Sequence, residues 1–123
     1  MQQIQSHRDL IVWQRAMDLA VRIYEISRSF PRTEVYGLTS QITRSTTSVA
    51  ANIAEGHARG SARDYAQFLS VARGSLMETE TLLTLAVRLG YIRPETALPS
   101  FDLITQINKM LISLRHKILP RNL

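Results

Sequence analysis

Apolar residues recur every three or four positions along four long segments, and no segment alternates for long between apolar and polar residues as a strand would. This period is that of an α-helix. Only a few residues connect one segment to the next, so consecutive helices are expected to pack antiparallel. The predicted fold for residues 1–123 is a single all-α domain, an up-down-up-down four-helix bundle. Its predicted helices span about residues 9–29, 34–57, 62–89 and 95–118.

Local signals support several of these helix ends. Thr33 is the candidate N-cap of the second helix and Ser61 is that of the third. Gly90 suits the position just after the end of the third helix. In the fourth segment, Pro99 either kinks the helix or moves its start to about Ser100.

The second segment carries very little charge. Its apolar face begins at Val35, and most of its other positions are Ser, Thr, Ala, Gln and Asn. Arg44 is the only charged residue between residues 35 and 54. A helix with one side in solvent normally carries more charge, so we expect this helix to be buried against a second subunit as well as its own core. On this interpretation, a Glu at Ser45 or Thr46 breaks the oligomer without unfolding the subunit.

The composition is that of an ordinary globular protein, with 45% hydrophobic and 20% charged residues. Fifteen basic residues, mostly Arg, outweigh ten acidic ones and give a net charge of +5. This balance permits binding to nucleic acid or to an anionic surface, although a basic protein without such a partner has the same composition. The absence of cysteine excludes disulfides and thiolate chemistry and fits a reducing cytoplasm. We expect neither a signal peptide nor a membrane span.

Motifs that would point to catalysis or metal binding are missing. The sequence contains no HExxH pair, no Walker loop and no G-x-S-x-G elbow. Its nearest approach to the Glu-x-x-His pattern of di-metal helical bundles is Glu55-Gly56-His57, which has the wrong spacing. We therefore predict no catalytic residue, no metal site and no cofactor, and we expect that the protein is not an enzyme.

Polar residues inside apolar or small-residue stretches form a second candidate cluster. They are Arg44, Asn52, Glu55, Arg73, Ser75 and Glu78. One interpretation is an acid–base pair of Glu55 and Glu78 tuned by Arg73. The favoured interpretation is a structural polar network or subunit interface, because buried charges need partners.

The predicted topology distributes charge unequally between the two ends of the bundle. One end has a net charge of about +3 and holds all three histidines, whereas the other end has about +1. The bases of the first end are the candidate nucleic-acid-binding residues, and they are Arg8, Arg59, Arg63, Arg115, Lys117 and Arg121. In a ring of parallel subunits this difference would repeat around one rim and attract phosphates. The alternative is a solvated face with salt bridges between helices.

An ordered series of motifs resembles a known family. The motifs are Val12-Trp13-Gln14, Glu34-x-Tyr36-Gly37-Leu38, Asn52-Ile53-Ala54-Glu55-Gly56 and Ala72-Arg73-Gly74-Ser75-Leu76-x-Glu78. The chain is identified through them, over about residues 8–118, as resembling the four-helix bundle proteins encoded in intervening sequences of bacterial 23S ribosomal RNA genes. That family carries the label "S23 ribosomal protein". The accessory variability protein of diversity-generating retroelements is similar.

The resemblance implies a homo-oligomeric ring, a pentamer, without catalytic activity. Its retroelement relatives bind nucleic acid and a reverse transcriptase, so a reverse transcriptase encoded nearby is a possible partner. The leading hypothesis is a non-enzymatic oligomer that binds nucleic acid, either RNA or an RNA–DNA hybrid. The alternative is a protein-interaction scaffold that does not bind nucleic acid.

Overall fold

The structure of the protein is a computed structural model that describes residues 4–119. Four α-helices and two short 3-10 helices make up the fold, and no strand occurs among these residues. The all-α, four-helix prediction is therefore confirmed. In chain order the elements are η1 (His7–Asp9), α1 (Ile11–Ser27), η2 (Arg32–Glu34), α2 (Leu38–His57), α3 (Ala62–Arg88) and α4 (Pro94–Ile118).

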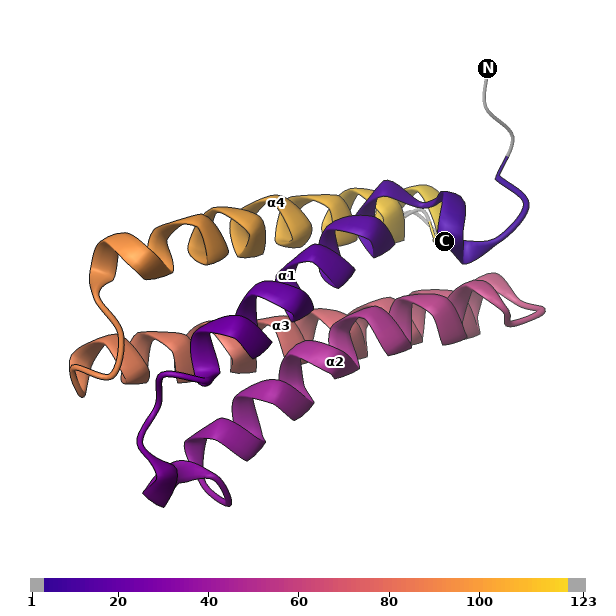
Figure 1. Cartoon of the computed structure of the whole chain (residues 1–123). Coiled ribbons are helices and arrows are strands. Elements are labelled where there is room, and N and C mark those ends of the chain that lie inside the picture. The colour runs from indigo at the N-terminus through magenta and orange to yellow at the C-terminus, as the bar shows by residue number, and fades with distance from the viewer. Residues whose placement is uncertain (1–3, 120–123) are drawn as a thin grey trace.

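The four helices pack as a bundle in which each contacts the next along the chain and α1 also contacts α4. The contact between α2 and α3 is the most extensive. Figure 1 shows successive helices joined at alternate ends of the molecule. The start of α1, the α2–α3 turn and the end of α4 therefore lie at one end, and η2 and the α3–α4 turn lie at the other (Figure 1).

Aliphatic side chains from all four helices fill the core. Burying each such side chain contributes about 1.5–3 kcal/mol relative to leaving it in water. The largest fully buried members are Leu19, Ile23, Ile42, Ile53, Leu69, Leu76, Leu83, Ile104, Ile107 and Leu111. They follow the three-and-four spacing from which the helices were predicted.

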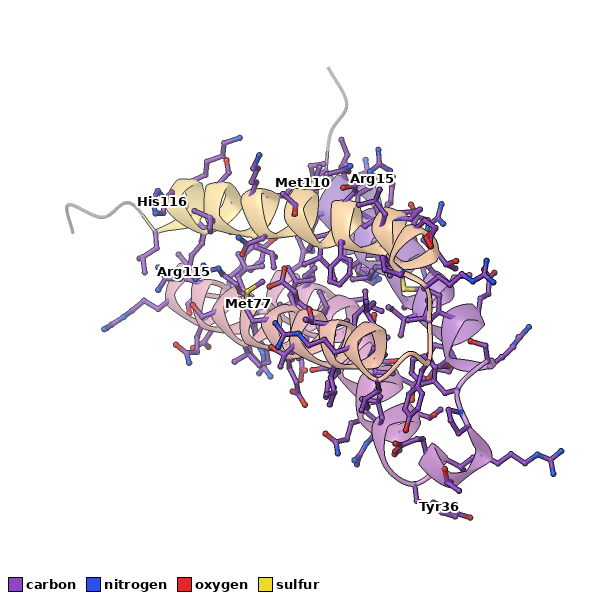
Figure 2. The ribbon with its side chains drawn as sticks, turned by 90° about the vertical axis from the view of Figure 1, so that its left-hand side faces the viewer. Arg15, Tyr36, Met77, Met110, Arg115 and His116 are labelled. Atoms are coloured by element: carbon purple, nitrogen blue, oxygen red, sulfur yellow. The ribbon has the colours of Figure 1, made fainter. Side chains whose placement is uncertain are left out.

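The second helix begins later than predicted, at Leu38 rather than at residue 34. The capping group is the Glu34 carboxylate, whose Oε1 accepts the Leu38 N–H at 3.1 Å, and Thr33 does not cap the helix. A β-carbon at Gly37 would lie 2.7 Å from that oxygen, so glycine leaves room for this contact. Val35 accordingly precedes the helix and is half exposed, and Tyr36 points away from the bundle (Figure 2).

The ends of α3 agree with the predicted signals, and those of α1 differ slightly. The Ser61 hydroxyl accepts the Asp64 N–H at 3.1 Å and caps α3. Gly90 adopts φ +78 after α3, and the Tyr91 N–H then reaches the Ala86 carbonyl at 2.9 Å. The first helix spans residues 11–27 rather than 9–29, because η1 precedes it and a short turn follows it.

Of the two alternatives for Pro99, a kink or a later start of the helix, the later start is not observed. The fourth helix begins at Pro94, a favoured first-turn position, and continues through Pro99 without interruption. Pro99 lies only one turn into the helix, where the missing N–H removes one hydrogen bond from the first full turn.

Candidate nucleic-acid interface

The predicted basic residues lie at the end of the bundle where η1, the α2–α3 turn and the last turn of α4 meet (Figure 1). We call this the basic end; its described bases are Arg8, Arg59, Arg63, Arg115 and Lys117. Arg121 lies outside the described residues. The structure thus brings together residues that are more than one hundred positions apart in the chain.

Arg59 is the most constrained of these bases. Its Nη2 lies 3.3 Å from Glu55 Oε1, and its guanidinium carbon lies 4.6 Å from the centre of the Phe68 ring. The Glu55 carboxylate compensates much of its charge, and the ring holds the side chain across the start of α3. Arg59 is therefore less available for phosphate than the sequence indicated.

The remaining bases keep their charge uncompensated. Within residues 4–119, ion pairs shorter than 4.0 Å join only Arg15 to Asp18 and Arg59 to Glu55. Arg8, Arg63 and Lys117 are exposed, and Arg115 is half-buried. These four bases carry the positive potential of the basic end.

Aromatic packing holds two histidines at this end. The His7 ring meets Trp13 edge-on with centroids 5.0 Å apart, and His57 meets Tyr65 in the same way at 5.7 Å. The Asp9 carboxylate accepts the N–H groups of Gln5 and Ser6 at 2.9 and 3.2 Å. These bonds, with a smaller contribution from nearby His57, hold the pKa of Asp9 below its ordinary value.

Neutral side chains form the polar contacts between α2 and α3. The hydroxyls of Ser45 and Thr79 lie 2.8 Å apart, and those of Ser48 and Ser75 lie 2.9 Å apart. Asn52 Nδ2 donates to Ser48 Oγ at 2.9 Å. We call this row the hydroxyl seam. Sequence reasoning identified Asn52 and Ser75 but missed the others, although their three-, four- and seven-residue spacings place them on one face of each helix.

The charged members of the predicted polar network do not join this seam. Arg73 Nε donates to Asn108 Oδ1 of α4 at 2.8 Å, and Glu55 pairs with Arg59. Arg44 and Glu78 are exposed.

The structure also separates the two carboxylates of the alternative acid–base pair. Thr79, next to Glu78, pairs with Ser45, which precedes Glu55 by ten residues in α2, or about 15 Å along the helix axis. Glu55 and Glu78 therefore belong to different levels of the bundle.

The positions chosen from the sequence to disrupt an oligomer lie inside the subunit. Thr46 is fully buried and Ser45 nearly so, so a Glu at either position would unfold the subunit. The prediction for these two residues is wrong because the small side chains of α2 pack mainly against α3. The exposed stripe of α2 consists of Gln41, Arg44, Thr47, Ala51 and Glu55.

Three apolar side chains of α1 are exposed, and one of them contacts this stripe. Met17, Val21 and Tyr24 are 41–56% exposed at helical spacing, and Tyr24 Oη lies 3.5 Å from Thr47 Oγ1 of α2. We call Met17, Val21, Tyr24, Thr47 and Ala51 the α1–α2 face. Its apolar and small side chains resemble the centre of a protein interface more than a solvated surface.

Two further findings limit the chemistry of the described residues. Between residues 4 and 119, no three His, Asp or Glu side chains gather closely enough to hold a metal ion. In the same part of the chain, no helix is both long and apolar enough to cross a membrane.

Fold and surface together define a small four-helix bundle protein with one basic end. Comparison with known protein families identifies the family to which this bundle belongs. Residues 8–113 match the 23S rRNA-intervening sequence protein family, and the chain belongs to this family. The resemblance found in the motifs is therefore confirmed over most of the chain.

A solved structure supports the same assignment. A protein of unknown function from the S23 ribosomal protein family of Bacteroides thetaiotaomicron VPI-5482 shares 33% sequence identity with the chain. The similarity covers 85% of this chain and 98% of that one, with a TM-score of 0.79. No protein of curated function matches the sequence.

Proposed function

We propose that the protein is a non-enzymatic, ring-forming antiparallel bundle that binds nucleic acid, RNA or an RNA–DNA hybrid, through its basic end. The supporting observation is that exposed Arg8, Arg63 and Lys117 gather at this end without a carboxylate within 4.0 Å among the described residues. Such bases bind phosphate backbones with little sequence preference and release counterions as they do so. We expect the protein to act in the cytoplasm, where its cysteine-free composition fits.

The proposed ring is supported by the α1–α2 face. Its exposed Met17, Val21 and Tyr24 side chains lose water when a second copy covers them. A closed ring repeats every surface around its axis, so the basic ends of all subunits would line one rim. The potential of that rim grows with the number of subunits, which strengthens a modest charge difference in the single chain.

An RNA titration tests the proposal. Fluorescence anisotropy measures binding of a short single-stranded RNA and of a matching RNA–DNA hybrid at two salt concentrations. We expect affinity to fall with salt, by about 0.7 decades per decade for each phosphate neutralised on a single strand. Replacing Arg63 and Lys117 together with Gln removes two such contacts, so it lowers the slope on the single strand by about 1.4 and weakens binding.

The opposite end of the bundle provides the matched control. Arg88 and Arg93 are exposed there, and their double replacement with Gln removes the same charge. This control should weaken binding much less. Equal losses from the two double variants, or no binding at low salt, would contradict the proposal and favour a protein-interaction scaffold.

A further inference from the structure

A pocket of about 440 Å³ opens between α3 and α4. Its volume lies in the range of small-molecule sites. The polar lining consists of Ser70, Arg73, Arg115 and His116. Figure 2 shows Arg115 extending from α4 towards α3, and Met77 pointing from α3 towards α4.

Both arginines of this pocket are held in place through Nε alone. Arg73 Nε donates to Asn108 Oδ1 at 2.8 Å, and Arg115 Nε donates to the Ala66 carbonyl at 3.3 Å. Both acceptors are neutral, so neither charge is compensated, and no carboxylate of residues 4–119 lies within 4.0 Å of either guanidinium. The terminal nitrogens are left to bind an anion.

The two guanidinium groups are anchored at different levels of the pocket. Arg73 reaches the level of Asn108 in α4, which is seven residues before Arg115, or about 10 Å along the axis. One phosphate group is too small to contact both guanidinium groups at that separation. A ligand that uses both must therefore carry two anionic groups with a spacer between them.

The floor of the pocket is apolar. Leu69 and Leu111 are buried beneath it, and the Met77 thioether is half-buried beside them. A polarizable sulfur over aliphatic carbon favours contact with a planar aromatic ring. The spacer that fits this floor is thus a planar, weakly polar group rather than another charge.

We propose that the α3–α4 pocket binds one nucleoside flanked by two phosphates, with Arg73 and Arg115 each holding a phosphate and the base lying against Met77. This ligand is either a free nucleoside bisphosphate or one unpaired nucleotide within a strand. Only the second of these ligands, a nucleotide within a strand, depends on the proposed nucleic-acid binding. The pocket shares only Arg115 with the bases of the basic end. His116 and Ser70 supply further hydrogen bonds at the pocket rim.

Gly74 provides a variant that separates binding from folding. It lines the pocket, and an added β-carbon there meets no heavy atom within 4 Å. Gly74→Leu fills the pocket while replacing a helix-weakening glycine with a good helix former. We expect this variant to lose ligand binding and to unfold at a temperature equal to or above that of the wild type.

Isothermal titration calorimetry with adenosine 3′,5′-bisphosphate, adenosine 5′-monophosphate and adenosine tests the proposal. We expect the bisphosphate to bind about tenfold more tightly than the monophosphate, and adenosine to bind most weakly. Arg73→Gln should reduce bisphosphate affinity to that of the monophosphate. Arg88→Gln removes an equal charge from the same helix outside the pocket and should change nothing.

The results distinguish this inference from the proposed function. No bisphosphate binding, or equal losses from Arg73→Gln and Arg88→Gln, overturns the pocket whether or not RNA binds the basic end. Bisphosphate binding that Gly74→Leu abolishes supports the pocket. If RNA then fails to bind at low salt, the ligand is the free nucleotide and the proposed function of the basic end is wrong.

Discussion

Gly56, near the end of α2, sets how closely that helix approaches α3. An added β-carbon would lie 2.7 Å from the Phe68 β-carbon and 3.3 Å from the Tyr65 carbonyl oxygen. Neither atom belongs to a flexible side-chain end, so the helices themselves would have to move apart. Gly74 provides a contrast within the same helix pair, because its surroundings are open.

We predict opposite effects when these two glycines are replaced with alanine. Gly56→Ala should destabilise the protein by about 1–3 kcal/mol, since overpacking outweighs the better helix propensity. Gly74→Ala should stabilise it by about 0.5–1 kcal/mol. Urea unfolding measures both free energies, and a stabilised Gly56→Ala variant would contradict the close approach.

Glu34 is the residue whose ionisation the fold uses most directly. The Leu38 N–H, and then the Tyr91 hydroxyl at 2.8 Å from Oε2, hold the pKa of this carboxyl below its ordinary value. A lowered folded-state pKa means that the carboxylate stabilises the protein above its unfolded-state pKa. That contribution is lost as the pH falls through the folded-state pKa.

We therefore expect Glu34→Gln to lower the melting temperature at neutral pH and to change it little in acid. Thermal unfolding followed by circular dichroism between about pH 3 and pH 7 measures this difference. Glu95→Gln is the matched control, because that exposed carboxylate accepts no hydrogen bond from a side chain within residues 4–119. A difference that grows on acidification would contradict the assigned role of Glu34.

At the scale of elements, periodicity predicted the four helices and most of their ends. It failed at the start of α2. The helical spacing already begins at Val35, but the Glu34 carboxylate caps the helix at Leu38, three residues later. It also failed to assign the small polar residues of α2. Ser and Thr are compatible with a solvated stripe, a subunit contact or a buried seam, and only the partner helix decides among them. The α3–α4 pocket likewise depends on rotamers that spacing does not specify.

The hydroxyl seam should show strong coupling between its partners. Thr79→Val removes the bond between the helices, while the buried Ser45 hydroxyl keeps the Ile42 carbonyl at 3.1 Å as its acceptor, so the change should cost about 0.5–1.5 kcal/mol. The double variant Ser45→Ala/Thr79→Val removes both groups and should cost less than the sum of the single variants. A double-mutant cycle by urea unfolding measures the coupling, and strict additivity would contradict a direct bond.

At the scale of the whole molecule, oligomerisation is the property on which the proposed rim depends. Thr47→Glu places a charge on the exposed α1–α2 face and should dissociate the ring without reducing helicity. Thr46→Glu, one position earlier, should instead unfold the subunit, because Thr46 is fully buried. Sedimentation velocity and circular dichroism distinguish the two outcomes.

A third variant controls for added charge in general. Val71 is 44% exposed on α3 and lies outside the α1–α2 face, so Val71→Glu should leave the oligomer intact. A wild-type protein that sediments as a monomer at micromolar concentration would contradict the ring and leave the basic end of a single chain as the whole binding surface.

The chemistry of the hydroxyl seam also sets the order in which the bundle opens in acid. Its hydrogen bonds join serine, threonine and asparagine, and none of these groups titrates, so acid does not weaken the contact between α2 and α3. The start of α2 and the α3–α4 turn, by contrast, are held together by the Glu34 carboxylate. Amide protons there should exchange with solvent first as the pH falls, whereas those along the seam exchange only on global unfolding.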